Sequence, residues 1–408
     1  MQTFAQHATD SGQETRNEAD AHDPILFLQS LIRCNTVTRQ GDEQALAEIL
    51  ASALRAAGNV EVSIHPIESG RCNLIARVKS ERPGPRIVLS GHLDTVPIGS
   101  VPWTHDPFAA DIVEGKLYGR GAVDMKSGLA ALLHAFLRVA RMHPSEWEGE
   151  LIFAATSAEE TGAEGAALMV ESGQLPAFDL MIIAEPTNNE LVVTHKGVLW
   201  LKLISHGKAA HGSMPSAGIN AIEKMIPLHA RLNERLRWEL THPMLGSATA
   251  TVTMFQAGVQ ANVIPDRCEM TIDIRSLPGH DHESILQAVH SEINAAIEAD
   301  PQSRFDVEVL LNLPALASSP GSPSVHTALD VLSMHLGRTI HARGAQYFTD
   351  ASVFQRIGGD ILIMGPGSPS LAHQVDEFVH VDDYLAAIDI YHKILLKLLS
   401  STRSARPE

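Results

Sequence analysis

Side chains able to hold metal ions recur along the chain, and several of them directly follow an apolar run. His92 and Asp94 come after the apolar residues 87–90, a pattern typical of a buried strand that ends at the carboxyl edge of a sheet. In an extended segment, residues two apart point the same way, so the carboxylate of Asp94 can hold the imidazole of His92 in one tautomer. The other ring nitrogen is then free for a metal. For this pair taken alone, a core histidine with a satisfied hydrogen bond is the alternative.

Acidic residues that can share the same cations follow at other strand and turn ends. Asp124 lies in the segment 119–128, between a glycine-rich turn and the start of a helix. Its two carboxylate oxygens can bridge two cations there, although alone it would be an ordinary helix N-cap. Glu159 and Glu160 follow the apolar run 151–155, and adjacent acids at a strand end are costly unless a cation or a proton separates them. One can be a ligand and its neighbour a base, but an acidic first turn stabilised by the helix dipole would also explain them.

Two further candidate ligands complete the set, one after another expected strand and one near the C-terminus. Glu185 follows the apolar run 180–183, and His373 lies in the segment 372–377. With the earlier clusters they offer only nitrogen and oxygen donors, which suit zinc, with cobalt or manganese as substitutes. A pair of ions about 3.5–4 Å apart is the usual arrangement for metal-assisted hydrolysis. Since these donors are expected at one edge of a sheet, the sequence predicts a binuclear metal site there.

The elements that position these side chains alternate between strand and helix, which indicates an α/β fold with a mixed, mostly parallel sheet flanked by helices. The first helix is expected to begin with Asp23 as N-cap and Pro24 as first helical residue. Expected strands are residues 60–67, 73–78, 86–90, 151–155, 180–183 and 360–364, and expected helices are residues 42–57, 125–142, 164–172, 325–336 and 382–399.

Between residues 198 and 311 the pattern changes to a β-α-β-β-α-β order, which is that of a ferredoxin-like unit able to fold as its own domain. We therefore expect a discontinuous metal-binding catalytic domain, residues 24–195 and 313–402, interrupted by a lid or dimerisation domain, residues 196–312. Residues 1–23 are expected to be a disordered leader. In the inserted domain we expect strands at residues 199–205, 248–256, 267–276 and 305–311, and helices at residues 218–240 and 282–299.

Length and composition narrow the class of protein. With 408 residues the chain is long enough for two or three domains and a large core. Its 31 basic and 48 acidic residues give a net charge of -17 without a basic run, which argues against nucleic acid and anionic membranes as partners. The scattered Cys34, Cys72 and Cys268 indicate a reducing compartment. Residues 1–23 are polar and acidic without the apolar core of a signal peptide, and no stretch approaches the length of a membrane span, so a cytoplasmic protein is expected.

The ordered set of motifs resembles the co-catalytic zinc amidohydrolases and exopeptidases, a family that includes acetylornithine deacetylase, succinyl-diaminopimelate desuccinylase, aminoacylase and glutamate carboxypeptidase. The resemblance extends from about residue 24 to residue 399. It implies two zinc ions per subunit and a cis peptide bond between Asp124 and Met125. It also implies a role for each site residue: His92 and Glu185 hold one zinc, Glu160 and His373 hold the other, Asp124 bridges them, Asp94 orients His92, and Glu159 is the general acid/base.

The resemblance also assigns roles in the inserted domain. His211 would reach an active site, commonly that of the partner subunit, and stabilise the developing oxyanion, which implies a homodimer. Asn262 and Arg275 match substrate-binding positions of the family, and the fixed fork of donors of Arg275 suits a carboxylate. An arginine that is simply solvated on the strand surface is the alternative. We also expect Gly365 and Gly367 to line the substrate cleft.

These observations predict a binuclear zinc hydrolase that cleaves the amide bond of a small-molecule N-acyl amino acid, of the deacetylase or desuccinylase type. A carboxypeptidase or dipeptidase acting at the same site is the alternative, because an N-acyl amino acid and a dipeptide differ little at the scissile bond. A non-catalytic binding protein derived from this fold is a remote alternative, which an intact Glu159 disfavours. The acyl group stays open, because residues 372–378 resemble the deacetylases, residues 119–126 resemble the desuccinylases, and residues 348–351 match neither.

Overall fold

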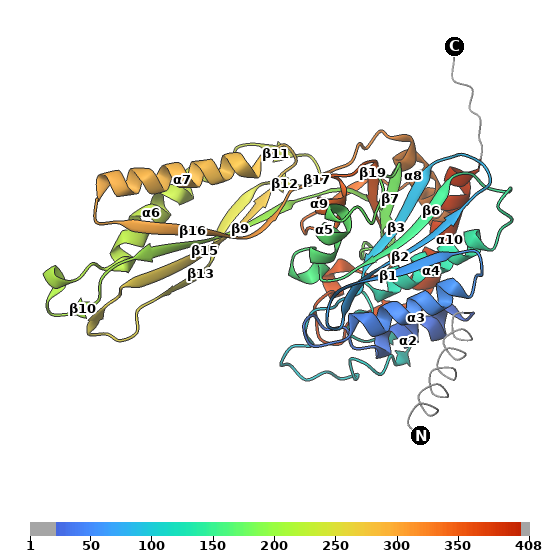
Figure 1. The fold of residues 1–408 in the computed structure, drawn as a ribbon, viewed down its shortest axis with the longest axis horizontal. Coiled ribbons are helices and arrows are strands. Elements are labelled where there is room, and N and C mark those ends of the chain that lie inside the picture. Colours follow the sequence, from blue (N-terminus) through green and yellow to red (C-terminus); the bar gives the residue numbers. More distant parts are fainter. Residues whose placement is uncertain (1–21, 401–408) are drawn as a thin grey trace, which may run out of the picture. The chain divides into compact units, whose positions relative to one another are not determined.

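The structure is a computed structural model that describes residues 22–400 (Figure 1). The chain folds into two compact units. Within the described part of the chain, unit 1 comprises residues 22–193, 318–343 and 349–400, and unit 2 comprises residues 194–317 and 344–348. The short return of the chain to unit 2 at residues 344–348 had no signal in the sequence. Residues 1–21 of the predicted leader lie outside the described residues.

A mixed β-sheet forms the centre of unit 1. Most of its strands lie in the order β1 (Glu61–Glu68), β2 (Arg71–Lys79), β6 (Glu150–Thr156), β3 (Arg86–His92), β7 (Leu180–Ile183), β19 (Asp360–Ile363) and β8 (Val192–His195). The central strands β6, β3, β7 and β19 run parallel, and the pairings of β1 with β2, of β2 with β6 and of β19 with β8 are antiparallel. Strands β3, β6 and β7 are nearly continuous buried runs, as expected where helices cover a parallel sheet. This confirms the predicted α/β sheet.

The helices of unit 1 include one that is almost completely buried, α4 (Lys126–Ala140). It packs against β3, β6, α2 (Pro24–Arg33) and α10 (Val381–Leu399), as expected for a helix that is apolar on nearly every side. Asp23 caps α2 through its side chain, as its place before Pro24 predicted. No described helix combines the length and the apolar character that a transmembrane segment needs. Other helices of the unit are α3 (Glu43–Arg55), α5 (Glu164–Glu171), α8 (Pro323–Leu336) and α9 (Ala351–Phe354).

A small antiparallel sheet, which the sequence did not indicate, joins two distant segments of unit 1. It contains β4 (Ile112–Val113), β5 (Lys116–Tyr118) and β20 (Phe378–His380). These strands are too short to produce a recognisable periodicity. Since β5 precedes Asp124 and β20 follows His373, the sheet ties together the segments that carry two of the predicted ligands.

Unit 2 contains the predicted order β9 (Gly197–His206), α6 (Ala221–Arg235), β13 (Thr249–Ala257), β15 (Arg267–Ser276), α7 (His282–Ala299) and β16 (Arg304–Leu313). The strands form an antiparallel sheet in the order β13-β15-β9-β16, which is the ferredoxin-like arrangement. Alternate residues of β15 are buried in a core shared with α6 and α7, so one face of the sheet is packed, while the other residues of β15 are partly exposed. Helix α6 is shorter than the predicted 218–240 and begins after Asn220, which caps it.

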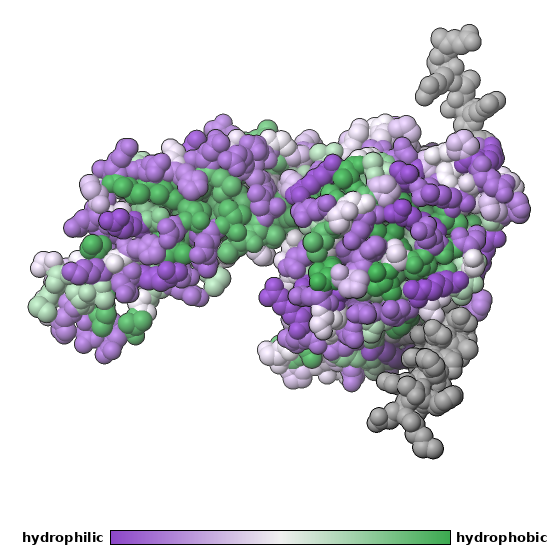
Figure 2. All heavy atoms as spheres, viewed as in Figure 1, coloured by the Kyte–Doolittle hydropathy of each residue, from purple (hydrophilic) through white to green (hydrophobic). Residues whose placement is uncertain are grey.

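The edge strands of the unit 2 sheet, β13 and β16, carry exposed apolar side chains. Met254 and Phe255 on β13, and Val309 and Leu310 on β16, are half-exposed. Figure 2 shows hydrophobic surface on this unit among hydrophilic side chains. An exposed strand edge with apolar side chains is able to pair with another chain.

Candidate metal centre

The candidate metal ligands lie where the parallel strands of unit 1 end. His92 is the last residue of β3, Glu159 and Glu160 begin a short 3₁₀ turn after β6, and Glu185 comes shortly after the end of β7. Because the carboxyl ends of parallel strands meet at one edge of the sheet, these side chains reach the same place, which is where open α/β folds hold their ligands.

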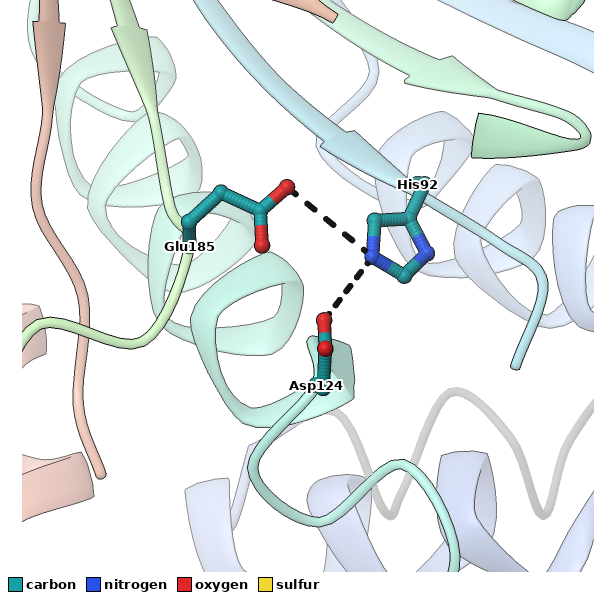
Figure 3. Close-up of side chains that lie close together, drawn as sticks. All are labelled: His92, Asp124 and Glu185. Atoms are coloured by element: carbon teal, nitrogen blue, oxygen red, sulfur yellow. Dashed lines mark hydrogen bonds and ion pairs between the residues drawn. The ribbon is translucent and has the colours of Figure 1, made fainter. Parts of the chain in front are cut away.

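His92, Asp124 and Glu185 form the first of two triads of possible metal ligands (Figure 3). The Nε2 atom of His92 lies 3.0 Å from Oδ1 of Asp124 and 3.9 Å from Oε1 of Glu185. One ligand atom from each residue lies within 4.8 Å of the others. Ligand atoms gathered this closely could hold one cation.

Asp124, Glu160 and His373 form the second triad. The Nε2 atom of His373 lies 3.2 Å from Oδ2 of Asp124 and 3.1 Å from Oε1 of Glu160. Asp124 therefore belongs to both triads and presents one carboxylate oxygen to each histidine, as a carboxylate that bridges two cations must. The two triads contain every residue that the sequence analysis assigned as a metal ligand. The peptide bond between Asp124 and Met125 is cis, as the family resemblance implied.

The electrostatics of the triads favours divalent cations. Burial raises the pKa of Glu185 well above its usual value, and the charge of Asp124 raises it further. The pKa of Glu160 is raised by the same two causes. Burial also opposes the ionisation of Asp124, but hydrogen bonds from His373 and His92 hold its pKa below the usual range. Divalent cations would reduce the repulsion between these buried carboxylates, and the nitrogen and oxygen donors fit zinc, cobalt or manganese.

The Nδ1 atom of His92 has a nearer partner than the one that the sequence indicated. It lies 2.8 Å from the backbone carbonyl oxygen of Asp94 and 3.6 Å from the carboxylate oxygen Oδ1 of the same residue. The expectation of a carboxylate partner assumed extended backbone through both residues, but β3 ends at His92. Either acceptor fixes the same tautomer, with the proton on Nδ1 and with Nε2 free for a metal.

The carboxylate of Asp94 supports the turn that carries Glu159 and Glu160. Its Oδ1 accepts a hydrogen bond from the backbone N–H of Glu159 at 3.0 Å, and its Oδ2 accepts one from the N–H of Glu160 at 3.2 Å. The side chain of Glu159 belongs to neither triad. Burial, together with the charge of Glu185, raises the pKa of Glu159 well above its usual value. A buried carboxyl group with a raised affinity for protons suits a general acid/base.

The candidate site residues of unit 2 are His211, Asn262 and Arg275. The Nδ1 atom of His211 accepts a hydrogen bond from the backbone N–H of Ser213 at 3.2 Å and contacts the hydroxyl of the same residue at 2.7 Å, so its exposed Nε2 is the donor. Asn262 is exposed. Arg275 pairs with Asp273 through Nε at 2.8 Å and Nη2 at 3.1 Å, which leaves fewer free donors for a substrate carboxylate than the sequence indicated.

Gly365 and Gly367 lie in unit 1, and Gly365 is close to the segment that carries Glu185. The carbonyl oxygen of Gly365 accepts a hydrogen bond from the backbone N–H of Thr187 at 3.1 Å. A Cβ atom added at Gly365 would lie 2.4 Å from the carbonyl oxygen of Ala184, so this close approach of two backbones requires glycine. The predicted part of both glycines in substrate binding stays a prediction.

Sequence reasoning missed several side chains that support the centre. Thr38 donates a hydrogen bond from its hydroxyl to the carboxylate of Asp94 at 3.0 Å. Glu377 accepts one from the backbone N–H of Asp124, also at 3.0 Å, and pairs with Arg120. Arg120 and Glu377 lie in the segments 119–128 and 372–377, which carry the candidate ligands Asp124 and His373. The opposite charges of Arg120 and Glu377 were therefore the signal in the sequence that could have indicated their pairing. Thr38 had no comparable signal.

The α/β fold and the two triads, which could hold a pair of metal ions, are the features that a metal-dependent hydrolase requires. Residues 88–397 match Peptidase family M20/M25/M40, and the chain therefore belongs to this family. This confirms the family resemblance that the motifs suggested and the expectation of an enzyme.

The chain is similar to two bacterial enzymes over most of its length. It is 30% identical over 374 residues to a probable succinyl-diaminopimelate desuccinylase of Staphylococcus aureus strain N315, with 84% of this chain and 89% of the relative covered. It is 33% identical over 363 residues to an acetylornithine deacetylase of Proteus mirabilis strain HI4320, with 87% of this chain and 90% of the relative covered.

A solved structure shares the fold. The YXEP protein of Bacillus subtilis, described as a dinuclear metal binding peptidase of the M20 family, superposes with a TM-score of 0.71 and 18% identity. The match covers 93% of this chain and 99% of the other. At this level of identity the likeness shows a common fold.

Proposed function

We propose that this protein is a binuclear zinc hydrolase that cleaves the amide bond of N-acyl amino acids, of the deacetylase or desuccinylase type. The observation that carries the proposal is the position of Asp124, whose two carboxylate oxygens face His92 and His373 in separate triads. The names of the two bacterial relatives support an acylated amino acid as the substrate.

In this proposal the chain holds two ions through the two triads. His92 and Glu185 would hold one ion, Glu160 and His373 would hold the other, and Asp124 would contribute to both. Zinc ions at these positions would supply Lewis-acid chemistry, by lowering the pKa of water and polarising the carbonyl oxygen of the scissile amide. Cobalt or manganese can use the same donors.

Glu159 is the general acid/base of the proposed reaction. Its carboxylate takes a proton from the attacking water and later gives this proton to the nitrogen of the departing amine. Burial and the charge of Glu185 raise its affinity for the proton, which helps to keep the proton on the side chain between the two steps. The hydrogen bond from its backbone N–H to Asp94 holds the residue in place.

Unit 2 supplies the remaining groups. His211 from a second copy of the chain would donate a hydrogen bond from Nε2 to the carbonyl oxygen as negative charge develops there. Asn262 would contact the substrate, and Arg275 would use the donors that Asp273 leaves free. The exposed apolar edges of β13 and β16 support a homodimer formed through this unit.

A carboxypeptidase or dipeptidase at the same site is the second candidate. The chain belongs to a peptidase family, and hydrolysis of a peptide bond would use the same base and the same ligands. The two candidates differ in the group on the acyl side of the scissile bond, so substrate preference separates them.

The test is a panel of N-acetyl, N-succinyl and N-benzoyl amino acids together with dipeptides, assayed with added zinc or cobalt. Preferred hydrolysis of an N-acyl amino acid is the expected result, with the Glu159→Gln variant as the inactive control. Preferred cleavage of dipeptides would select the peptidase. A metal-loaded protein that binds members of the panel but hydrolyses none would indicate a binding protein and overturn the proposal.

A further inference from the structure

The buried carboxylate of Glu377 binds the turn that carries Asp124. Its Oε1 accepts hydrogen bonds from the backbone N–H groups of Val123 at 2.8 Å and of Asp124 at 3.0 Å. Its Oε2 pairs with the guanidinium group of Arg120. Glu377 is completely buried and Arg120 is 1% exposed, so both charges are shielded from water. Each oxygen of this carboxylate therefore has a fixed partner in the turn.

Arg120 is itself held in one place. Its Nη2 atom donates to the carbonyl oxygen of Pro97 at 3.2 Å, and its guanidinium carbon lies 5.0 Å from the centre of the Trp103 ring. A buried ion pair is rigid when hydrogen bonds and packing surround both partners, and removal of one partner leaves an uncompensated charge. Through Arg120 the turn is thus bound both to the segment that carries Pro97 and Trp103 and to the segment that carries Glu377.

Glu377 also belongs to the segment that carries His373. His373 and Asp376 have positive φ angles of 64° and 55°, a conformation that non-glycine residues keep only where their surroundings impose it. The side chain of Asp376 accepts a hydrogen bond from the backbone N–H of Thr104 at 2.7 Å, and the carbonyl oxygen of Glu377 accepts one from Gly119 at 2.9 Å. These contacts hold the end of the segment that presents the His373 imidazole.

We infer that Glu377, together with Arg120, is a positioning residue that sets the distance between the Asp124 carboxylate and the His373 imidazole. Both of these groups belong to the second triad. The first triad depends less on Glu377, because β3 and the end of β7 in the central sheet deliver His92 and Glu185. Loss of the Glu377 charge therefore weakens mainly the metal position formed by the second triad. This inference rests on the metal centre of the proposed function.

The experiment is isothermal titration calorimetry of zinc into the metal-stripped full chain, compared between wild type and Glu377→Gln. Glutamine keeps the shape and the acceptor oxygen for the two N–H groups, but it removes the charge that faces Arg120. We expect two binding steps in wild type. In the variant we expect the step that belongs to the second triad, identified as the one that Glu160→Gln removes, to lose about 10- to 100-fold in affinity, as is typical when a residue that supports a ligand is changed. The other step changes little, and excess zinc restores kcat.

Asp389→Asn is the matched control. It removes an exposed ion pair with Arg138 at 2.6 Å in the same unit and should change neither binding step. If Glu377→Gln does not fold, Arg120→Lys takes its place, because lysine keeps the positive charge but loses the second donor group that reaches Pro97. The same selective loss of affinity is expected for this variant.

A folded variant with two unchanged binding steps overturns the inference and leaves the proposed function intact, even if its thermal stability is lower. Equal weakening of both steps overturns it as well, because a residue that sets the distance between Asp124 and His373 affects the second triad selectively. A wild-type chain that binds no metal overturns the proposed function and this inference together.

Discussion

Asp94 accepts a hydrogen bond from the backbone N–H of Glu159 at 3.0 Å, while its own carbonyl oxygen lies 2.8 Å from Nδ1 of His92. One residue thus orients a predicted metal ligand through its backbone and the predicted base through its side chain. The second carboxylate oxygen binds the N–H of Glu160 and the hydroxyl of Thr38. Replacement of this side chain should therefore affect the turn after β6 more than the imidazole.

The Asp94→Asn variant tests this division of roles. Its amide group can accept only one of the two backbone hydrogen bonds and places a donor against the other N–H group. We expect kcat at saturating zinc to fall by about 10- to 100-fold with little change in KM. Thr38→Val, which removes only the hydroxyl contact, should have a smaller effect. An Asp94→Asn enzyme with wild-type kcat would contradict the supporting role of the carboxylate.

Metal removal should abolish turnover, because histidine and carboxylate ligands without thiolate bind metal reversibly. A chelator followed by desalting gives the metal-free chain, and added zinc or cobalt should restore activity. The measurement is turnover together with elemental analysis of the same sample. Full activity in a sample shown to be free of metal would refute the binuclear mechanism.

Glu159 and Glu160 are neighbours in sequence with different predicted roles. Glu159→Gln keeps the shape of the side chain and removes the base, so kcat should fall by about 10²- to 10⁴-fold or more while the metal content stays near that of wild type. Glu160→Gln should lose metal, because its carboxylate belongs to the second triad. Kinetics and metal analysis of both variants check these outcomes. The opposite pattern, with metal lost only from Glu159→Gln, would exchange the two roles.

His211 should act on the active site of a second subunit. The test mixes two inactive variants, His211→Ala and Glu159→Gln, under conditions that exchange subunits. In a mixed dimer one site would have both wild-type residues, so activity should return toward about a quarter of wild type for random equal mixing. Each variant taken alone through the same procedure is the control. Absence of recovery, with exchange demonstrated by tagged subunits, would show that His211 does not act in trans.

The stability of the protein should fall in mild acid because of His134 on α4. Burial, with a contribution from the nearby Arg138, lowers the pKa of this histidine to about 4. In the unfolded chain its pKa is about 6.5, so the unfolded state binds the proton more readily between these two values. Stability is therefore lost as pH falls from about 6.5 through 4, by about 3 kcal/mol in the limit of low pH.

Urea unfolding between pH 7.5 and 4.5 checks this prediction by comparing wild type with His134→Leu. Leucine cannot take up a proton, so the variant should lose less stability than wild type across this range. Acid effects on the metal ligands are common to both proteins and cancel in the difference. His326→Leu, which changes an exposed histidine on α8, is the matched control. Parallel pH profiles for wild type and His134→Leu would contradict the prediction.

The sequence by itself determined most of the helices and strands, and it determined the strand ends at which the candidate metal ligands lie. The predicted helix at residues 282–299 and the strand at residues 267–276 match α7 and β15 as observed, and Asp23 caps α2. These features depend on periodicity, caps and turn residues that act within a few positions of the chain, so local pattern suffices to predict them. The same local logic placed His92 at the end of β3.

Only the tertiary structure decided which atoms meet across long separations in the chain. The sequence named Asp124 and His373 as ligands, but the short pairing of β5 with β20 that brings their segments together has no periodic signal. Arg120 and Glu377 lie 257 residues apart, and their contact depends on how the buried segments pack. The partner of His92 is a carbonyl oxygen because β3 ends at His92 and the chain turns there, a detail that the spacing of two residue types does not encode.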